Sequence, residues 1–147
     1  MIRRLHIERY RSILRADIDL GRVNLFIGAN GSGKSNILEA LGFLSAVAGR
    51  GLEAGALAER GVRLSLGPMF KSAFKNRDLP SNAAVTVEFD GAPRLTYGMS
   101  FTAGAADEAL KIRTDFFTLT SRSSPTGSTV APRTTTASSG SFSCDGW

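Results

Sequence analysis

The sequence is poor in the residues that many catalytic and metal centres use. It contains one cysteine, Cys144, and one histidine, His6, at opposite ends of 147 residues, and it contains no glutamine. A single cysteine excludes an internal disulfide and a cysteine-based zinc site. The distant histidine argues against an activated thiol. The composition therefore points away from thiol, disulfide and zinc chemistry.

Long apolar runs are also missing. No stretch approaches the ~20 apolar residues that a membrane-spanning helix needs. The first residues alternate arginines with aliphatic residues, unlike the apolar segment of a signal peptide. We therefore expect no membrane partner and a cytoplasmic location. A hydrophobic fraction of 42% and a charged fraction of 21% are typical of one globular domain with its own core.

Positive charge is concentrated at the start of the chain. The net charge is +5, and residues 1–15 hold one acid, Glu8, beside five arginines: Arg3, Arg4, Arg9, Arg11 and Arg15. Such a segment suits contact with nucleic acid or nucleotide phosphate, so DNA is a candidate partner. The alternative interpretation is that the arginines form the solvated face of a strand pair.

One glycine-rich stretch carries a chemical signature. Gly28 to Ser35, Gly-Ala-Asn-Gly-Ser-Gly-Lys-Ser, fits the phosphate-binding pattern G-x-x-x-x-G-K-[ST]. The glycines allow successive backbone N–H groups to point into one concavity. Lys34 would reach the β- and γ-phosphates, and the Ser35 hydroxyl would take one position on Mg²⁺. The stretch therefore predicts ATP or ADP with Mg²⁺ as ligands.

The flanking residues supply the setting that this loop requires, a strand before it and a helix after it. An apolar run over 22–27 predicts a buried strand, and helical spacing of apolar residues predicts a helix over 34–48. Alternation upstream predicts amphipathic strands over 1–10 and 12–20. The fold class expected is α/β, with a mixed β-sheet around the loop and helix.

Downstream, the clearest pattern is a β-hairpin with strands over 84–89 and 94–101 and a four-residue turn, Asp90 to Pro93. The other elements expected are a short helix over 52–59, a short strand over 62–66, a helical turn over 68–74 and a strand over 109–117.

The composition changes at Thr114. Sixteen of the last 34 residues are serine or threonine, and aliphatic residues nearly vanish. Such a segment buries too little apolar surface to offset its ordering entropy, so we expect a nucleotide-binding lobe over 1–113 and a disordered tail over 114–147. The abrupt change suits a frameshift or misplaced stop in a longer gene. A natural Ser/Thr-rich linker is the alternative.

Three features together resemble a known family: the segment Ile7-Glu-Arg-Tyr-Arg-Ser-Ile13, the run Val23 to Ile27, and the loop continuing through Asn-Ile-Leu-Glu-Ala-Leu41. They are similar to the N-terminal lobe of RecF/SMC-like and OLD-type AAA family ATPases, whose heads resemble those of ABC transporters. The resemblance covers residues 1–48 strongly and 49–101 weakly. It implies a P-loop NTPase fold in an incomplete ATPase head.

The resemblance also implies a set of site residues. The residues that match the family's nucleotide contacts are Arg11, Ser12, Asn30, Gly31, Ser32, Gly33, Lys34, Ser35 and Asn36, and Ser35 alone matches a metal ligand. The other groups that the family uses for hydrolysis are missing. There is no apolar run ending in Asp-Glu (Walker B), no ABC signature, no switch histidine and no Q-loop glutamine.

The resemblance implies ATP hydrolysis coupled to DNA repair, chromosome handling or phage defence, with a homodimer formed through the nucleotide face. Phosphoryl transfer needs charge stabilisation from several directions, so we expect this chain alone to hydrolyse ATP poorly. The alternative is a non-catalytic nucleotide-binding module that acts by dimerisation or with a partner. A small P-loop kinase or GTPase is a weaker alternative, because the base-reading motif N-K-x-D is absent.

Overall fold

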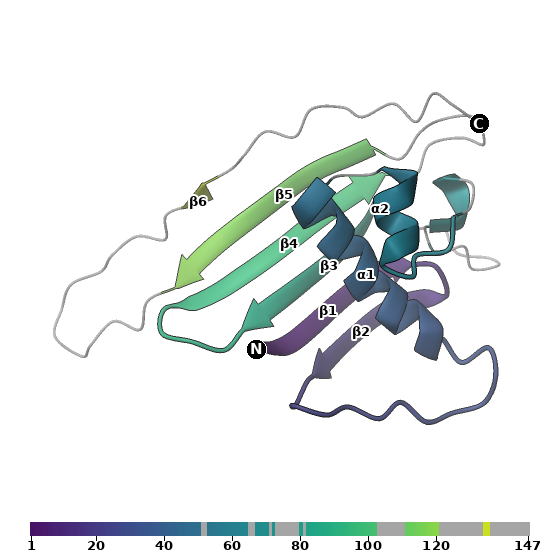
Figure 1. The fold of residues 1–147 in the computed structure, drawn as a ribbon, viewed down its shortest axis with the longest axis horizontal. Coiled ribbons are helices and arrows are strands. Elements are labelled where there is room, and N and C mark those ends of the chain that lie inside the picture. The colour runs from purple at the N-terminus through teal and green to yellow at the C-terminus, as the bar shows by residue number, and fades with distance from the viewer. Residues whose placement is uncertain are drawn as a thin grey trace, which may run out of the picture.

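The protein is one antiparallel sheet covered by helices on one face, in a computed structural model of the chain (Figure 1). The structure describes residues 1–50, 53–64, 67–70, 72, 80, 82–102, 111–120 and 134–135. The strands, in the order in which they lie side by side, are β2 (Ile13–Asp19), β1 (Ile2–Tyr10), β3 (Asn82–Phe89), β4 (Arg94–Thr102), β5 (Lys111–Thr120) and β6 (Thr134–Thr135). The helices are α1 (Lys34–Arg50), α2 (Ala54–Glu59) and the 3₁₀ turn η1 (Gly67–Phe70).

The strands predicted over 1–10, 12–20, 84–89 and 94–101 are confirmed, and β5 overlaps the strand predicted over 109–117. The pairs β1–β2 and β3–β4 form as expected, and the turn 90–93 joins the second pair. All pairings among the described strands are antiparallel, so the parallel pairing that a mixed sheet requires is not among them. Strand β5 continues to Thr120, past the expected boundary at 113/114, because its backbone pairs with β4 along that whole length. The division into lobe and tail stays a prediction.

Alternation along the strands gives the sheet one apolar and one polar face. Leu5 and Ile7 of β1 are fully buried, while His6 between them contacts Asp17 of β2 at 2.6 Å on the other face. Val85 and Val87 of β3 repeat the buried pattern. An antiparallel sheet with helices on one side buries one face and leaves the other to water. The sheet therefore provides a single core beneath the helices.

Helix α1 lies across the apolar face and packs its buried residues, Ala40, Phe43, Leu44 and Ala46, against the sheet (Figure 1). Phe43 is fully buried, and its ring centroid lies 4.9 Å from that of Phe101, 5.5 Å from that of Phe70 and 5.9 Å from that of Tyr10. Such tilted ring contacts add stability beyond the apolar area that they bury. This aromatic cluster therefore joins α1, β1, β4 and η1.

Helix α1 and the chain after α2 approach each other very closely. A Cβ atom added to Gly42 of α1 would collide with the carbonyl oxygen of Arg60. Glycine is needed here because any side chain would force the two backbones apart. The residues that follow α2 are thus fixed against the middle of α1, and Val62 among them is buried in the core.

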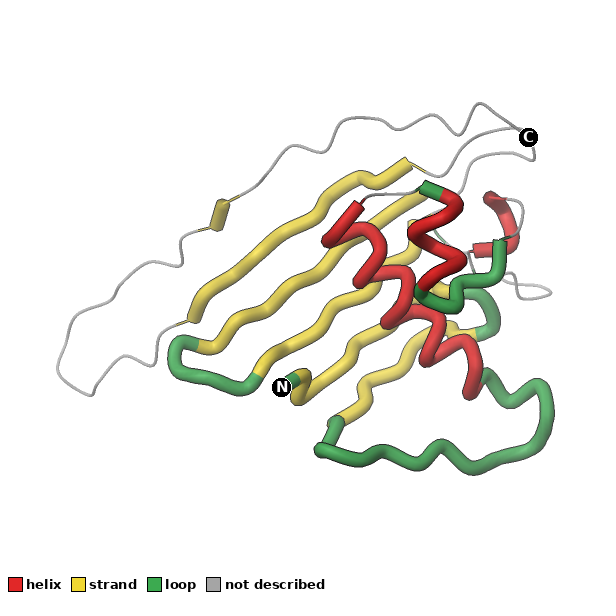
Figure 2. The backbone as a smooth tube through the Cα atoms, viewed as in Figure 1, coloured by secondary structure: helices red, strands yellow, loops and turns green. Residues whose placement is uncertain are grey.

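The prediction of a buried strand over 22–27 is wrong for this structure. The segment makes no strand pairing within the described residues, and Val23, Leu25 and Ile27 are 89%, 81% and 85% exposed. Figure 2 shows it as a loop that runs from the end of β2 to the start of α1. The physical reason is that an apolar, β-branched sequence forms a strand only beside a neighbour that completes its hydrogen bonds. The described strands provide none at this position.

The shorter elements between α1 and β3 are partly as predicted. Helix α2 covers Ala54–Glu59 of the expected 52–59, and η1 covers Gly67–Phe70, overlapping the expected turn. The predicted strand over 62–66 is absent from its described part, residues 62–64, and its remainder lies outside the described residues. Leu52, Lys71 and residues 73–74 of these predictions also lie outside the described residues. Among the described residues, none of the helices combines the length and apolar character that crossing a membrane requires.

Phe43→Ala tests the aromatic cluster. Removing a fully buried ring leaves a cavity, and such changes typically cost about 3–5 kcal/mol of unfolding free energy. We expect a loss in this range by urea denaturation followed by circular dichroism. The matched control is Met69→Ala, because Met69 neighbours Phe70 but is 58% exposed. Equal, small losses in both variants would contradict the proposed packing.

Asp19→Asn tests the polar face. Arg4 donates to Asp19 at 2.8 Å and thereby lowers the pKa of this carboxyl below its ordinary value. The carboxylate therefore contributes stability at neutral pH, and this contribution is lost as the pH falls through the folded-state pKa. The variant should be less stable at pH 7, and its melting temperature should fall less steeply below about pH 4. Asp90→Asn, at a site with no ion pair among the described residues, is the control, and a slope unchanged in Asp19→Asn would refute the assignment.

Candidate functional site

The glycine-rich loop leads directly into α1. Gly31 and Gly33 have φ angles of 82° and 94°, in the left-handed region that favours glycine. The Gly33 carbonyl accepts hydrogen bonds from the backbone N–H groups of Asn36 at 2.9 Å and Ile37 at 3.1 Å, which begins the helix. The first N–H groups of a helix have no partner within it and carry the positive end of the dipole. The loop therefore lies at a position suited to an anion.

Lys34 folds back over the loop that precedes it. Its ammonium group donates to the carbonyl oxygens of Gly28 at 2.7 Å and Ala29 at 2.6 Å, and it lies 3.3 Å from the Ser32 hydroxyl. The loop is thus wrapped around one positive charge. Ser32 also closes the loop, because its backbone N–H donates to the Ala29 carbonyl at 3.3 Å.

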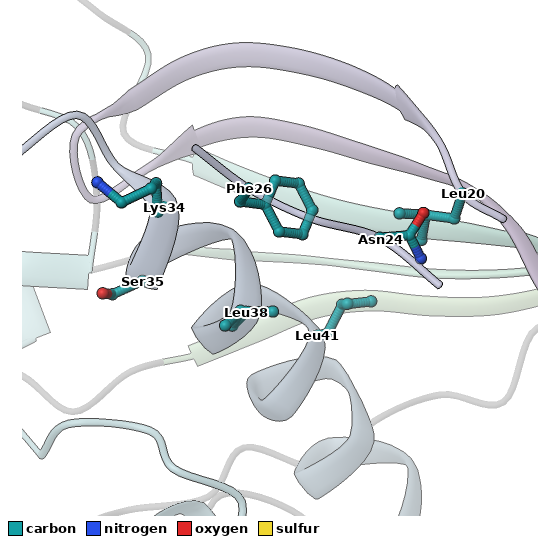
Figure 3. A pocket seen from close by; sticks show the side chains of 7 residues that line it. All are labelled: Leu20, Asn24, Phe26, Lys34, Ser35, Leu38 and Leu41. Carbon is teal, nitrogen blue, oxygen red and sulfur yellow. The ribbon is translucent and has the colours of Figure 1, made fainter. Parts of the chain in front are cut away.

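An open pocket lies beside the start of α1. It has a volume of about 500 Å³ and is lined by Leu20, Asn24, Phe26, Lys34, Ser35, Leu38 and Leu41. Figure 3 shows Lys34 and Ser35 at one end, with Leu38 and Leu41 continuing along α1 and Phe26 beside them from the segment that precedes the loop. The polar end of the pocket therefore coincides with the predicted phosphate and metal contacts, and the rest of its lining is mostly apolar.

Ser12 and Asn36 are brought to the loop. The Asn36 side-chain amide donates to the Ser12 hydroxyl at 2.7 Å. A Cβ atom built on Gly33 would lie 3.4 Å from the same hydroxyl. The turn between β1 and β2 therefore contacts the glycine loop. This proximity is needed if Ser12 and Asn36 are to belong to one nucleotide site, as the sequence predicts.

Arg11, in that same turn, is directed elsewhere. It has a φ angle of 48°, which is strained for a non-glycine residue. Its guanidinium donates to the Glu39 carboxylate at 2.5 Å and to the Arg63 carbonyl at 2.7 Å, and it lies 4.5 Å from the centroid of the Phe70 ring. The structure thus places Arg11 in an ion pair under the helix, and a nucleotide contact for it stays a prediction.

Glu39 and Arg63 were not predicted as site residues. Glu39 is 3% exposed, and its carboxylate also accepts from the backbone N–H of Arg63 at 2.9 Å and from the Arg63 guanidinium at 2.7 and 3.1 Å. A buried charge requires such partners, because taking it out of water is costly. The signal in the sequence was an acid within the apolar pattern of α1, with arginines elsewhere able to pair with it.

Burial changes one acid–base group next to this cluster. Burial raises the pKa of the Tyr10 phenol, and the negative charge of Glu39 raises it further by a smaller amount. Tyr10 is therefore neutral at physiological pH. Its ring packs against those of Phe43, Phe70 and Phe101.

The described residues contain no group of three or more histidine, cysteine or acidic side chains that could hold a metal ion. Ser35, the predicted metal ligand, is therefore not beside such a group among the described residues. His6, between Asp17 and Glu8, lies on the polar face of the sheet rather than at the loop.

Comparison with known families agrees with this geometry. A model of the AAA ATPase domain matches residues 1–115. The chain belongs to this family. Membership in an ATPase family implies nucleotide binding, and the α/β P-loop NTPase fold expected from the sequence is confirmed.

Among individual proteins, the chain is similar to RecF proteins of several bacteria. The chain is 37% identical over 99 residues to the DNA replication and repair protein RecF of Caulobacter vibrioides, covering 63% of this chain and 25% of that protein. It is 57% identical over 42 residues to RecF of Shewanella halifaxensis, covering 28% of this chain and 12% of the relative. The chain therefore matches a quarter or less of the length of these relatives.

A solved structure described as "Structural biochemistry of ATP-driven dimerization and DNA stimulated activation of SMC ATPases" has the same fold. The TM-score is 0.57 at 22% identity, covering 79% of this chain and 68% of the other. At this identity the likeness concerns the fold alone. Together with the RecF relatives, it confirms the predicted resemblance to the N-terminal lobe of RecF/SMC-like ATPases.

Proposed function

We propose that this chain is the ATP-binding lobe of a RecF/SMC-type ATPase and binds ATP or ADP with Mg²⁺ at residues 28–36. The single observation that carries the proposal is the closed loop around Lys34 at the N-terminus of α1. A loop that already surrounds an ammonium group with carbonyl oxygens can exchange those acceptors for phosphate oxygens. The charge that holds the loop together then binds the ligand.

The proposed roles follow from the positions of the side chains. Backbone N–H groups of the loop, apart from that of Ser32, would face the phosphates, and Lys34 would supply the positive charge. The Ser35 hydroxyl is one ligand of Mg²⁺, which when bound would neutralise charge on the phosphates. Ser12 and Asn36 support the loop from the sheet side, since they contact each other and lie against Gly33.

The wider activity belongs to the same proposal. The RecF relatives support a role in DNA replication or repair, and the SMC structure supports dimerisation driven by ATP and activation by DNA. Phage defence, as expected from the OLD-type resemblance, and a cytoplasmic location are further parts of it. Because the chain matches a quarter or less of the RecF relatives' length, hydrolysis, DNA binding and dimerisation are proposed for the complete ATPase. A non-catalytic nucleotide-binding module is the second candidate, favoured by the lack, among the described residues, of a cluster of three or more acidic, histidine or cysteine side chains that could hold a metal ion.

Lys34→Ala should abolish most nucleotide binding. A charge-assisted hydrogen bond typically contributes enough that its loss lowers affinity about tenfold or more. Isothermal titration with ATP and Mg²⁺ measures the change, and Arg94→Ala, a charge deletion at the start of β4, is the matched control. Equal affinities in the variant and the unmodified protein would refute the assignment of the loop.

The purified chain should turn over ATP at a rate near background. Ser35 offers one metal ligand, while the acidic pair, the signature loop and the switch histidine that the family uses are missing from the sequence. Removing one such group commonly costs about 10²-fold in rate, although such losses do not simply add. Phosphate release provides the measurement. A steady rate of about 1 s⁻¹ that disappears in Lys34→Ala would overturn this prediction and favour groups such as Asp78, Glu88 or Asp90.

A further inference from the structure

Arg63 follows α2 and contacts both the helix that begins at the loop and the buried acid on that helix. Its guanidinium donates to the Glu39 carboxylate at 2.7 and 3.1 Å and to the side-chain oxygen of Asn36 at 2.5 Å. The Arg63 side chain is 62% exposed, whereas that of Glu39 is 2% exposed. One end of this interaction is therefore fixed in the core, and the other lies at the surface beside the glycine loop.

The anchor of this contact is rigid. Glu39 is held at the same time by Arg11 and by the backbone N–H of Arg63, so the carboxylate plane is fixed from two segments of the chain. A guanidinium that pairs with a fixed carboxylate through two of its nitrogens has a defined plane. The pairing with Glu39 therefore orients the Arg63 nitrogen that donates to Asn36.

The Asn36 amide is fixed in turn. Its oxygen accepts from Arg63 and its nitrogen donates to the Ser12 hydroxyl at 2.7 Å, so both ends of the amide are occupied. Ser12 lies against Gly33, and the Asn36 backbone N–H donates to the Gly33 carbonyl. A continuous line of contacts thus runs from the core carboxylate through Arg63 and Asn36 to the last glycine of the loop.

We propose that Arg63 is a positioning residue for nucleotide binding, which acts through Asn36 and Ser12 to hold the loop in its binding conformation. The inference rests on the proposed function of residues 28–36. A loop that is ordered before the ligand arrives loses less entropy on binding, so fixing it raises affinity without a contact to the ligand. Lysine cannot replace Arg63 here, because a single ammonium group cannot pair with Glu39 and reach Asn36 with the geometry of a planar fork.

The test compares the affinity for a fluorescent ATP analogue among four proteins: the unmodified chain, Arg63→Lys, Asn36→Ala and the double variant. Arg94→Ala, a substitution at the start of β4, again serves as the control. We expect Arg63→Lys to lower affinity about tenfold despite the retained charge. The double variant should lose no more affinity than Asn36→Ala alone, because residues that act through one another are not additive.

Circular dichroism melting of each variant separates loss of positioning from loss of fold. Wild-type affinity in Arg63→Lys would overturn the inference, since charge alone would then suffice. Additive losses in the double variant would also overturn it, because Arg63 would then act independently of Asn36. If the unmodified chain and Arg94→Ala bind no ATP analogue, the proposed function itself fails. Binding in both, with Arg63→Lys unaffected, removes only the role of Arg63.

Discussion

The buried carboxylate of Glu39 is the interaction on which the site depends. It lies on α1, five residues after Lys34, and it is paired with Arg11 from the turn between β1 and β2 and with Arg63 from the chain after α2. Taking such a charge out of water costs several kcal/mol, and only well-placed partners offset that cost. Three segments that are far apart in the sequence must therefore meet at one point for the helix and its loop to be placed. The fold and the candidate site share this requirement.

Most of the sheet could be predicted because its signals are local. Alternation identified β1, β2 and the β3–β4 hairpin, since each residue's side is set by its own position along a strand. The loop and α1 could be predicted for the same reason, from glycine spacing and from the helical period. The pairing of β1 with β3 brings the two halves of the sheet together and connects segments about eighty positions apart. It could not be predicted, because neither segment contains a local signal that identifies the strand with which it pairs.

The failures concern residues whose role depends on distant partners. Val23, Leu25 and Ile27 have the composition of a strand, but the described structure offers no neighbour to pair with them, and they face solvent. The burial of Glu39 could not be predicted, because an acid on a helix is usually solvated and only the fold brings Arg11 and Arg63 to it. Of the N-terminal arginines, Arg4 and Arg15 pair with Asp19 and Asp17 on the exposed face, as the alternative interpretation expected.

The close approach at Gly42 has a mechanical consequence for this chain. Helix α1 is fixed to the chain after α2 at Glu39 and again, one turn further along, where Gly42 meets the Arg60 carbonyl. Two fixed points on one helix prevent it from rolling about its axis, so it can shift only together with residues 60–63. A displacement of the start of α1 would therefore also move residues 60–63, about 25 positions away in the sequence.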